Sequence, residues 1–74
     1  MISYTRVTTE NLKELYNNTE GNLYYRIPDF PPSTYDVVDG FDYEELLEGL
    51  VSGECELIYI AGPSLGINVK IEED

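Results

Sequence analysis

The residues in this sequence that are best suited to chemistry are carboxylates, which gather between positions 36 and 56. That stretch, DVVDGFDYEELLEGLVSGECE, holds eight Asp and Glu side chains and no Lys or Arg. The whole chain contains no His, the commonest general base at neutral pH. Cys55 therefore has no His to activate it, and its apolar surroundings favour a structural thiol over a nucleophile.

Sequence signatures of other active sites are also missing. There is no Gly-rich phosphate loop and no spacing of zinc ligands. Two carboxylates can hydrolyse a glycoside, but that reaction needs a pocket for the sugar, which the thin core of a short chain does not easily enclose. We therefore predict a protein with no catalytic residue and no cofactor.

A calcium site is the main alternative use of these acids. Asp36, Asp39 and Asp42 recur at every third position. A calcium loop of the EF-hand type instead needs oxygen ligands at alternate positions, and here Val38 and Gly40 occupy those positions. The pattern therefore predicts no specific metal site, and only weak, nonspecific binding of divalent ions to the acidic surface.

Length and composition indicate one folded domain, covering residues 1–74. Hydrophobic residues make up 42% of the 74 positions, which is too many for a disordered acidic tail. Fifteen acidic residues against four basic ones give a net charge of −11. Such a charge repels nucleic acid and anionic membranes, so we expect a basic protein as the partner.

The sequence also favours a cytoplasmic location. No apolar run is long enough to cross a bilayer, and the opening MISYTRV lacks the apolar region of a signal peptide. The single Cys55 cannot form an internal disulfide. These features are typical of a domain that folds in a reducing compartment.

The first half of the chain is predicted to contain two strands and a helix. Residues 2–7 alternate as a strand does, and Thr8 is a suitable N-cap for a helix that extends to Asn18. Val7 and Leu12 are spaced as a hydrophobic staple around that cap. Residues 22–27 form the second predicted strand, and the prolines at 28, 31 and 32 predict an irregular link after it.

The second half is predicted to contain a helix and a hairpin. Asp42 as N-cap and Glu45 three residues later form a capping box, and Gly53 ends the helix. Its predicted buried stripe consists of Leu46, Leu47, Leu50 and Val51. Residues 55–61 and 67–71 are predicted strands, paired as a hairpin. In the first of them Ile58 and Ile60 should share one face, with Cys55, Leu57, Tyr59 and Ala61 on the other, and in the second Ile67, Val69 and Ile71 should point inward. The order β-α-β-α-β-β predicts an α+β fold, with two helices on one face of a small, mainly antiparallel sheet.

The acidic helix could present carboxylates in rows. Glu44 and Glu48 lie four positions apart, which places their side chains roughly 6 Å from each other on one face. Asp42 and Glu45 form a second close pair. Such spacings are of the same order as those between successive phosphates of DNA, at about 3.4 Å of axis per charge on each strand. Four further acids would extend these rows: Asp36, Asp39, Glu54 and Glu56. The alternative is that these residues form the solvated face of an amphipathic helix.

Tyrosines add a second candidate feature, because the chain has seven of them. Tyr35 and Tyr43 flank the acidic run, and Tyr is enriched at protein interfaces, so we predict that both contact the partner. Tyr24 and Tyr25 are adjacent in a strand, so one of them should face outward, where it would suit a symmetric homodimer.

With its size, its charge and the run YDVVDGFDYEELLEGL, the chain resembles the small acidic DNA-mimic proteins that phages make to disable DNA-binding proteins of the host. The resemblance implies an inhibitor that works in the host cytoplasm or nucleoid. It implies as targets the histone-like nucleoid protein HU, restriction enzymes, CRISPR effectors or uracil-DNA glycosylase. HU is our first expectation because it is small, basic and largely indifferent to DNA sequence. The alternative is an ordinary acidic adaptor between proteins, in which charge serves solubility alone.

Overall fold

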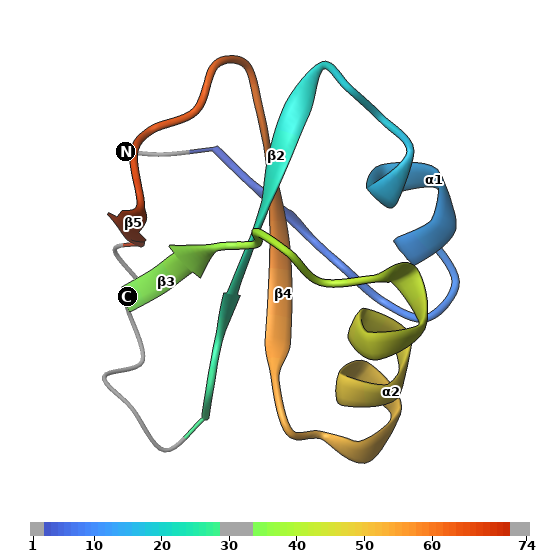
Figure 1. Ribbon diagram of the computed structural model, residues 1–74. Helices are drawn as coiled ribbons and strands as arrows, with labels where there is room; N and C mark the ends of the chain where they lie inside the picture. Colours follow the sequence, from blue (N-terminus) through green and yellow to red (C-terminus); the bar gives the residue numbers. More distant parts are fainter. Residues whose placement is uncertain (1–2, 29–33, 72–74) are drawn as a thin grey trace.

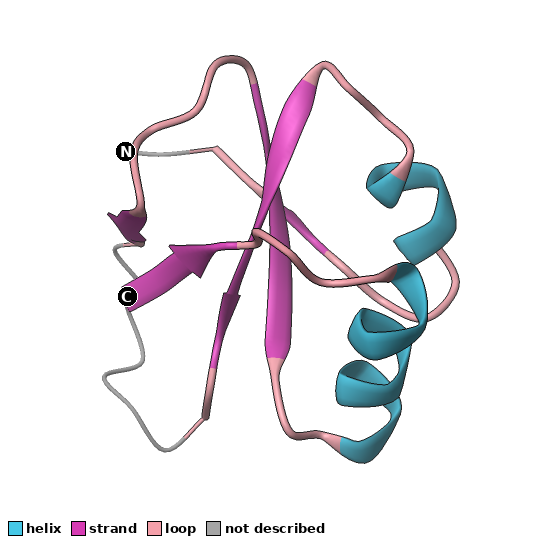
Figure 2. Ribbon diagram, in the orientation of Figure 1, coloured by secondary structure: helices cyan, strands magenta, loops and turns pink. Residues whose placement is uncertain are grey.

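The computed structural model describes residues 3–28 and 34–71, and it has the α+β fold that the sequence predicts. Figures 1 and 2 show two helices packed on one side of a sheet, and neither described helix is long and apolar enough to cross a membrane. The elements in chain order are β1 Thr5–Arg6, α1 Leu12–Tyr16, β2 Gly21–Arg26, β3 Thr34–Val37, α2 Tyr43–Ser52, β4 Glu56–Ala61 and β5 Asn68–Lys70.

The sheet contains one strand more than the sequence predicts. β3 lies directly after the proline-rich link, most of which falls in residues 29–33, outside the described residues. Only four residues long, β3 has a single fully buried side chain, Tyr35, so its apolar pattern is too short to be recognised. The sheet nevertheless depends on β3, because it is hydrogen-bonded to both β2 and β5.

The predicted hairpin of the last two strands is wrong. The antiparallel sheet has the order β1-β4-β2-β3-β5, so β4 lies between β1 and β2, and β5 pairs with β3. The loop between β4 and β5 is held by other elements. The Gly62 N–H donates to the carbonyl of Glu20 at 2.8 Å, and the Leu65 N–H donates to the Tyr24 hydroxyl at 3.0 Å. These two hydrogen bonds hold the loop beside β2, and the chain then continues to the far edge of the sheet, where β5 pairs with β3.

Both faces of the central strands are buried, because consecutive side chains point to opposite faces. On β4, Leu57 and Tyr59 pack under the helices, and Ile58 and Ile60 pack on the other face. This alternation along β4 confirms the prediction for that strand. The cluster under the helices also includes Val7, Leu12, Leu23 and Leu46.

The face away from the helices has a core of its own. Tyr24 of β2 and Tyr35 of β3 are fully buried there, together with Ile58, Ile60, Val69 and Ile71. β3 and β5 are turned out of the plane of β2 and β4, so the sheet curls around these side chains (Figure 1). Ile67 was predicted to join them, but it precedes β5 and is 78% exposed.

The predicted start and end of α1 are wrong: its N-cap is Asn11 and not Thr8, and the helix ends at Tyr16, short of Asn18. Thr8 and Asn11 are instead bonded to each other in the turn that precedes the helix. The Thr8 hydroxyl accepts from the Asn11 N–H at 3.4 Å, and the Asn11 side-chain oxygen accepts from the Thr8 N–H at 2.7 Å. Val7 and Leu12 are both buried in the same cluster, but with the cap at Asn11 they do not hold the positions of a hydrophobic staple.

The predicted start and end of α2 are confirmed, but its buried stripe is partly wrong. Asp42 and Glu45 form the capping box, and Gly53 ends the helix with a left-handed φ of 79°. Leu46 is buried, whereas Val51 is 71% exposed. Gly49 takes the inward position instead, because its bare Cα lets the helix approach Cys55 closely.

Candidate protein-binding interface

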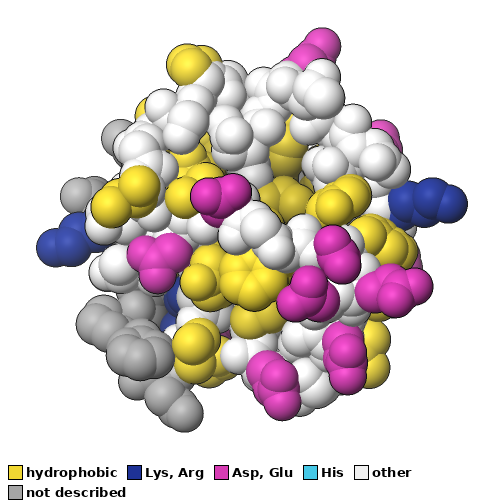
Figure 3. All heavy atoms as spheres, viewed as in Figure 1, with side chains coloured by type: hydrophobic (Ala, Val, Ile, Leu, Met, Phe, Trp, Pro, Cys, Tyr) yellow, Lys and Arg dark blue, Asp and Glu magenta, His cyan; other side chains and the backbone are white. Residues whose placement is uncertain are grey.

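Seven predicted carboxylates are exposed, and they come from three parts of the chain. We call them the acidic face: Asp36, Asp39, Asp42, Glu44, Glu45, Glu48 and Glu54. Figure 3 shows acidic side chains spread over one side of the molecule around a central apolar area, with basic side chains projecting at the edges of the view. Among the described residues, none of these seven carboxylates makes a salt bridge.

α2 holds the largest group of these acids. Glu44 and Glu48 are exposed one turn apart, while Leu46 between them anchors the helix in the core. Glu45 is fixed further, because its Oε1 accepts from the Asp42 backbone N–H at 3.2 Å. Acids in the first turn also suit the positive end of the helix dipole. The helix therefore presents its carboxylates from a rigid support.

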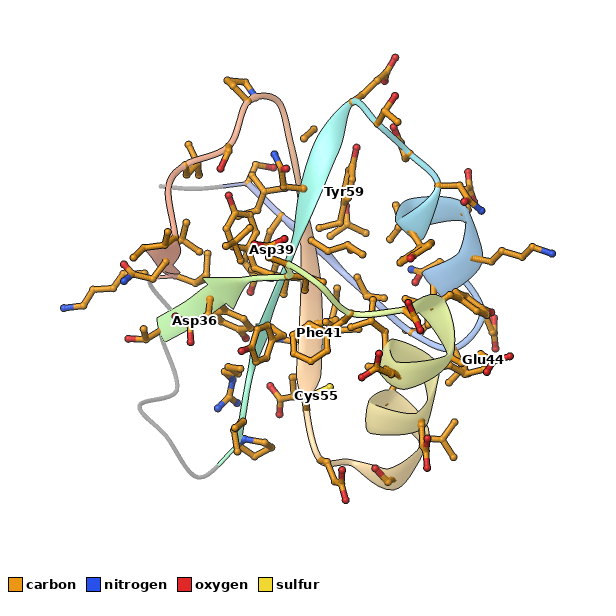
Figure 4. The ribbon with its side chains drawn as sticks, in the orientation of Figure 1. Asp36, Asp39, Phe41, Glu44, Cys55 and Tyr59 are labelled. Atoms are coloured by element: carbon orange, nitrogen blue, oxygen red, sulfur yellow. The ribbon has the colours of Figure 1, made fainter. Side chains whose placement is uncertain are left out.

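The Asp36 side chain points outward because side chains alternate between the two faces of β3. Its neighbour Tyr35 points into the second core, so the Asp36 side chain must lie on the opposite face of the strand. Val38 then packs against the core under the helices, and Asp39 follows it at the surface. Figure 4 shows Asp36 and Asp39 on the β3 side and Glu44 on the α2 side of this view.

The structure places Glu56 apart from the other predicted carboxylates. Its carboxylate lies 2.7 Å from Nη2 of Arg26, and the two residues face each other on β4 and β2. The Arg26 guanidinium also lies 5.7 Å from the centre of the Tyr35 ring. Glu56 therefore neutralises an arginine of its own chain and is not a free carboxylate, which corrects its assignment to the partner-binding surface.

The predicted tyrosine contacts are also corrected in part. Tyr35 is fully buried in the second core, so it cannot contact a partner. Tyr43 is half-buried and packs edge-on against Tyr16, with ring centres 5.7 Å apart. Tyr24 is fully buried and Tyr25 is half-buried, so Tyr24 is not available for the predicted dimer contact.

An apolar groove interrupts the acidic face, and the sequence did not predict it. We call it the Phe41 groove; it has a volume of about 660 Å³ and lies between α2 and the adjoining ends of β2 and β4. Its lining consists of Tyr25, Ile27, Pro28, Phe41, Glu45, Leu46, Gly49, Gly53, Glu54 and Cys55. Figure 4 shows Phe41 and Cys55 in the middle of the view, between Asp36 and Glu44.

Side-chain packing explains why the groove stays open. Phe41 is 38% exposed, and its ring packs edge-on against Tyr25 at 5.5 Å between centres. That contact holds Phe41 as a wall of the groove. Gly49 contributes no side chain, so the Cys55 Sγ packs directly against the helix at this position, and both residues line the groove.

Cys55 lines the Phe41 groove, and its thiol is partly buried. Burial raises the pKa of the Cys55 thiol above its usual value, and the nearby Glu54 carboxylate adds to the effect. The thiol is therefore less ionised at neutral pH than a free cysteine, the reverse of what a nucleophile needs. Among residues 3–28 and 34–71, no cluster of acidic or cysteine side chains is arranged to hold a metal ion.

No protein-family model, curated protein or solved structure matches this chain. The acidic face and the Phe41 groove are therefore the features of the molecule that bear on its function.

Proposed function

We propose that this protein is a non-catalytic inhibitor that occupies the DNA-binding surface of a basic protein, with its carboxylates standing in for DNA phosphates. The observation that carries the proposal is the acidic face. It gathers seven exposed carboxylates from β3, α2 and the adjoining loops, and among the described residues none has a cationic partner within the chain. HU is the first target to test, on the basis of the resemblance stated above.

Electrostatic free energy favours a basic partner for this surface. Carboxylates that are neighbours on the surface lie within one Debye length, about 8 Å at physiological salt, so their mutual repulsion is only partly screened. The net charge of −11 means that few basic groups in the chain offset this repulsion. A partner with Lys and Arg on a concave surface would relieve the repulsion, and its attraction would speed association.

The placement of the acids supports mimicry of a phosphate backbone more than a general need for solubility. Solubility requires only charges that are spread over the surface. Here Glu44 and Glu48 form a row along α2, and Asp36 and Asp39 continue the acidic face on β3 and the loop after it. A protein surface that binds rows of DNA phosphates would contact these fixed carboxylates instead.

Competition with DNA tests this proposal directly. HU is bound to a short labelled duplex, and the protein is titrated in at constant salt while the shifted DNA band is followed. We expect the band to disappear in proportion to the added protein, with a displacement that weakens as salt rises. A ternary complex of HU, DNA and this protein would refute mimicry for HU. Displacement of DNA from a different basic protein, with no effect on HU, would retain the mechanism and replace the target.

A capture experiment separates this proposal from the adaptor hypothesis. The immobilised protein is exposed to a bacterial lysate, and the captured proteins are eluted in steps of rising salt. An inhibitor of the proposed kind should capture nucleic-acid-binding proteins and release them steeply as salt rises. An adaptor whose acidity serves only solubility should keep its partner at high salt.

A further inference from the structure

We infer that the Phe41 groove is an anchor site for an apolar side chain that projects from a lysine- and arginine-rich segment of the target. The inference builds on the proposed function, because it adds a specific apolar contact to a surface that otherwise attracts by charge. It commits to one occupant, an aliphatic or aromatic side chain with basic residues on both sides of it in the partner's sequence.

The lining of the groove selects the apolar part of this occupant. Ile27, Phe41 and Leu46 provide apolar surface, and Phe41 is held in place by its contact with Tyr25. A volume of about 660 Å³ falls within the range of roughly 300–1,000 Å³ that is typical of binding pockets. Burying an apolar side chain there would remove both surfaces from water.

The charged residues at the rim of the groove favour basic residues beside the apolar side chain of the occupant. Among the described residues, Glu45 and Glu54 are the charged members of the lining, and both are exposed carboxylates. The nearby Arg26 is already paired with Glu56, so it does not oppose a cationic partner. A neutral apolar ligand would gain nothing from this rim, whereas a Lys or Arg beside the apolar side chain would meet a carboxylate.

The arrangement matches the usual anatomy of a protein-binding surface. Binding energy concentrates in a few apolar anchors at the centre, and a polar rim surrounds them. In this chain the acidic face would govern association rate and salt dependence, and the Phe41 groove would govern how slowly the partner leaves.

Two peptides of equal charge test the inference. They are acetylated, amidated pentapeptides of sequence KKLKK and KKSKK, titrated into the ¹⁵N-labelled protein and followed by amide chemical shifts. We expect KKLKK to bind at least tenfold more tightly and to shift the amides of Phe41, Gly49 and Cys55. KKSKK should shift mainly the amides of the acidic face.

Two variants of the protein test whether the preference for KKLKK over KKSKK depends on the Phe41 groove. Phe41→Ala removes one wall of the groove and should reduce the preference for KKLKK to less than threefold. Val51→Ala is the matched control, because Val51 lies on α2, is 71% exposed and does not line the groove. It should leave the preference unchanged, and amide spectra of both variants confirm that they are folded.

The possible results distinguish this inference from the proposed function. Equal affinity for the two peptides, with shifts confined to the acidic face, would overturn the inference and leave the proposed function in place. Tight binding of KKLKK with no contribution from the carboxylates would support the groove and count against mimicry. Groove amides that shift when the protein alone is concentrated would identify a second copy as the occupant and overturn the inference.

Discussion

Gly49 of α2 packs directly against Cys55, so closely that a Cβ atom on Gly49 would lie 2.6 Å from the cysteine Sγ. The two residues are also joined through the backbone, since the Cys55 N–H donates to the Gly49 carbonyl at 3.3 Å. This contact sets the distance between α2 and the start of β4. The same pair lines the Phe41 groove.

The first prediction concerns coupling between these two residues. Gly49→Ala should lower the free energy of unfolding by about 1–2 kcal/mol, because the new methyl group overpacks the contact with Sγ. In a Cys55→Ala background the same change should be neutral or stabilising by up to about 1 kcal/mol, since Ala is a better helix former than Gly. Urea denaturation of the four proteins measures the coupling. Additive effects of the two changes would contradict the steric reason.

A second prediction concerns the pH dependence of the Cys55 thiol. Burial raises its pKa above the usual value, so the folded protein keeps the proton to higher pH than the unfolded chain does. This contribution to stability is present below the pKa of the unfolded thiol and is lost as pH rises through the folded pKa. The free energy of unfolding should therefore fall as pH is raised above about 9, close to the ordinary thiol pKa of 9.0.

Two measurements check this behaviour. The rate of alkylation by iodoacetamide should rise with pH to a midpoint above that of a free cysteine peptide. Cys55→Ala should remove part of the loss of stability at alkaline pH. A midpoint equal to or below that of the free peptide would show that the thiol is not shielded as the structure describes.

Sequence patterns predicted the parts of the fold that local physics determines. The capping box of Asp42 and Glu45 and the end of α2 at Gly53 depend on neighbouring residues only, and both were correct. The alternation along β4 was also correct, because consecutive side chains of a strand point to opposite faces whatever the strand pairs with.

The pairing of strands could not be predicted in the same way. β4 and β5 are separated by a short turn-like sequence, which suggests a hairpin, but the loop is bonded instead to Glu20 and to the Tyr24 hydroxyl. Those partners are about forty residues away in the sequence, so no local pattern reports them. The unpredicted β3 fills the resulting place between β2 and β5.

The features of the candidate site also differ in whether a local sequence pattern could predict them. Exposure of Glu44 and Glu48 follows from helix periodicity and could be predicted. The pairing of Glu56 with Arg26 depends on the register between β4 and β2, which the sequence alone does not reveal. The Phe41 groove depends on the meeting of α2 with two strands, and the single local hint was a Gly at an inward helix position.

A third prediction contrasts Glu54 with Glu56, two acids of the same stretch with opposite roles. Glu56→Gln should lower the free energy of unfolding by about 1–2 kcal/mol, because Arg26, with only 12% of its side chain exposed, loses its anionic partner. Glu54→Gln should change stability by less than about 0.5 kcal/mol, as expected of an exposed surface residue.

For binding of the target, we expect Glu54→Gln to have the larger effect and Glu56→Gln the smaller one. Glu54 lies on the acidic face and on the rim of the Phe41 groove, so Glu54→Gln should weaken association with the target, measured at low salt. Glu56→Gln should leave the affinity of the folded fraction unchanged. A larger loss of affinity for Glu56→Gln would return that residue to the partner-binding surface.

The last prediction tests the acidic face as a unit. Replacing Glu44, Glu45 and Glu48 together with Gln should weaken target binding at least tenfold at low salt and reduce the dependence of binding on salt. The fold should persist, because Gln at position 45 can still accept from the Asp42 N–H.

The matched control is the triple change of Glu10, Glu14 and Glu20 to Gln, which removes the same charge from exposed positions in and around α1. Relief of general repulsion should raise the melting temperature of both triple variants at low salt, and added NaCl should narrow the difference from the parent protein. Only the α2 variant should lose the target, measured by titration calorimetry at several salt concentrations. Equal losses of affinity in the two variants would mean that net charge, and not the placement of carboxylates on α2, determines binding.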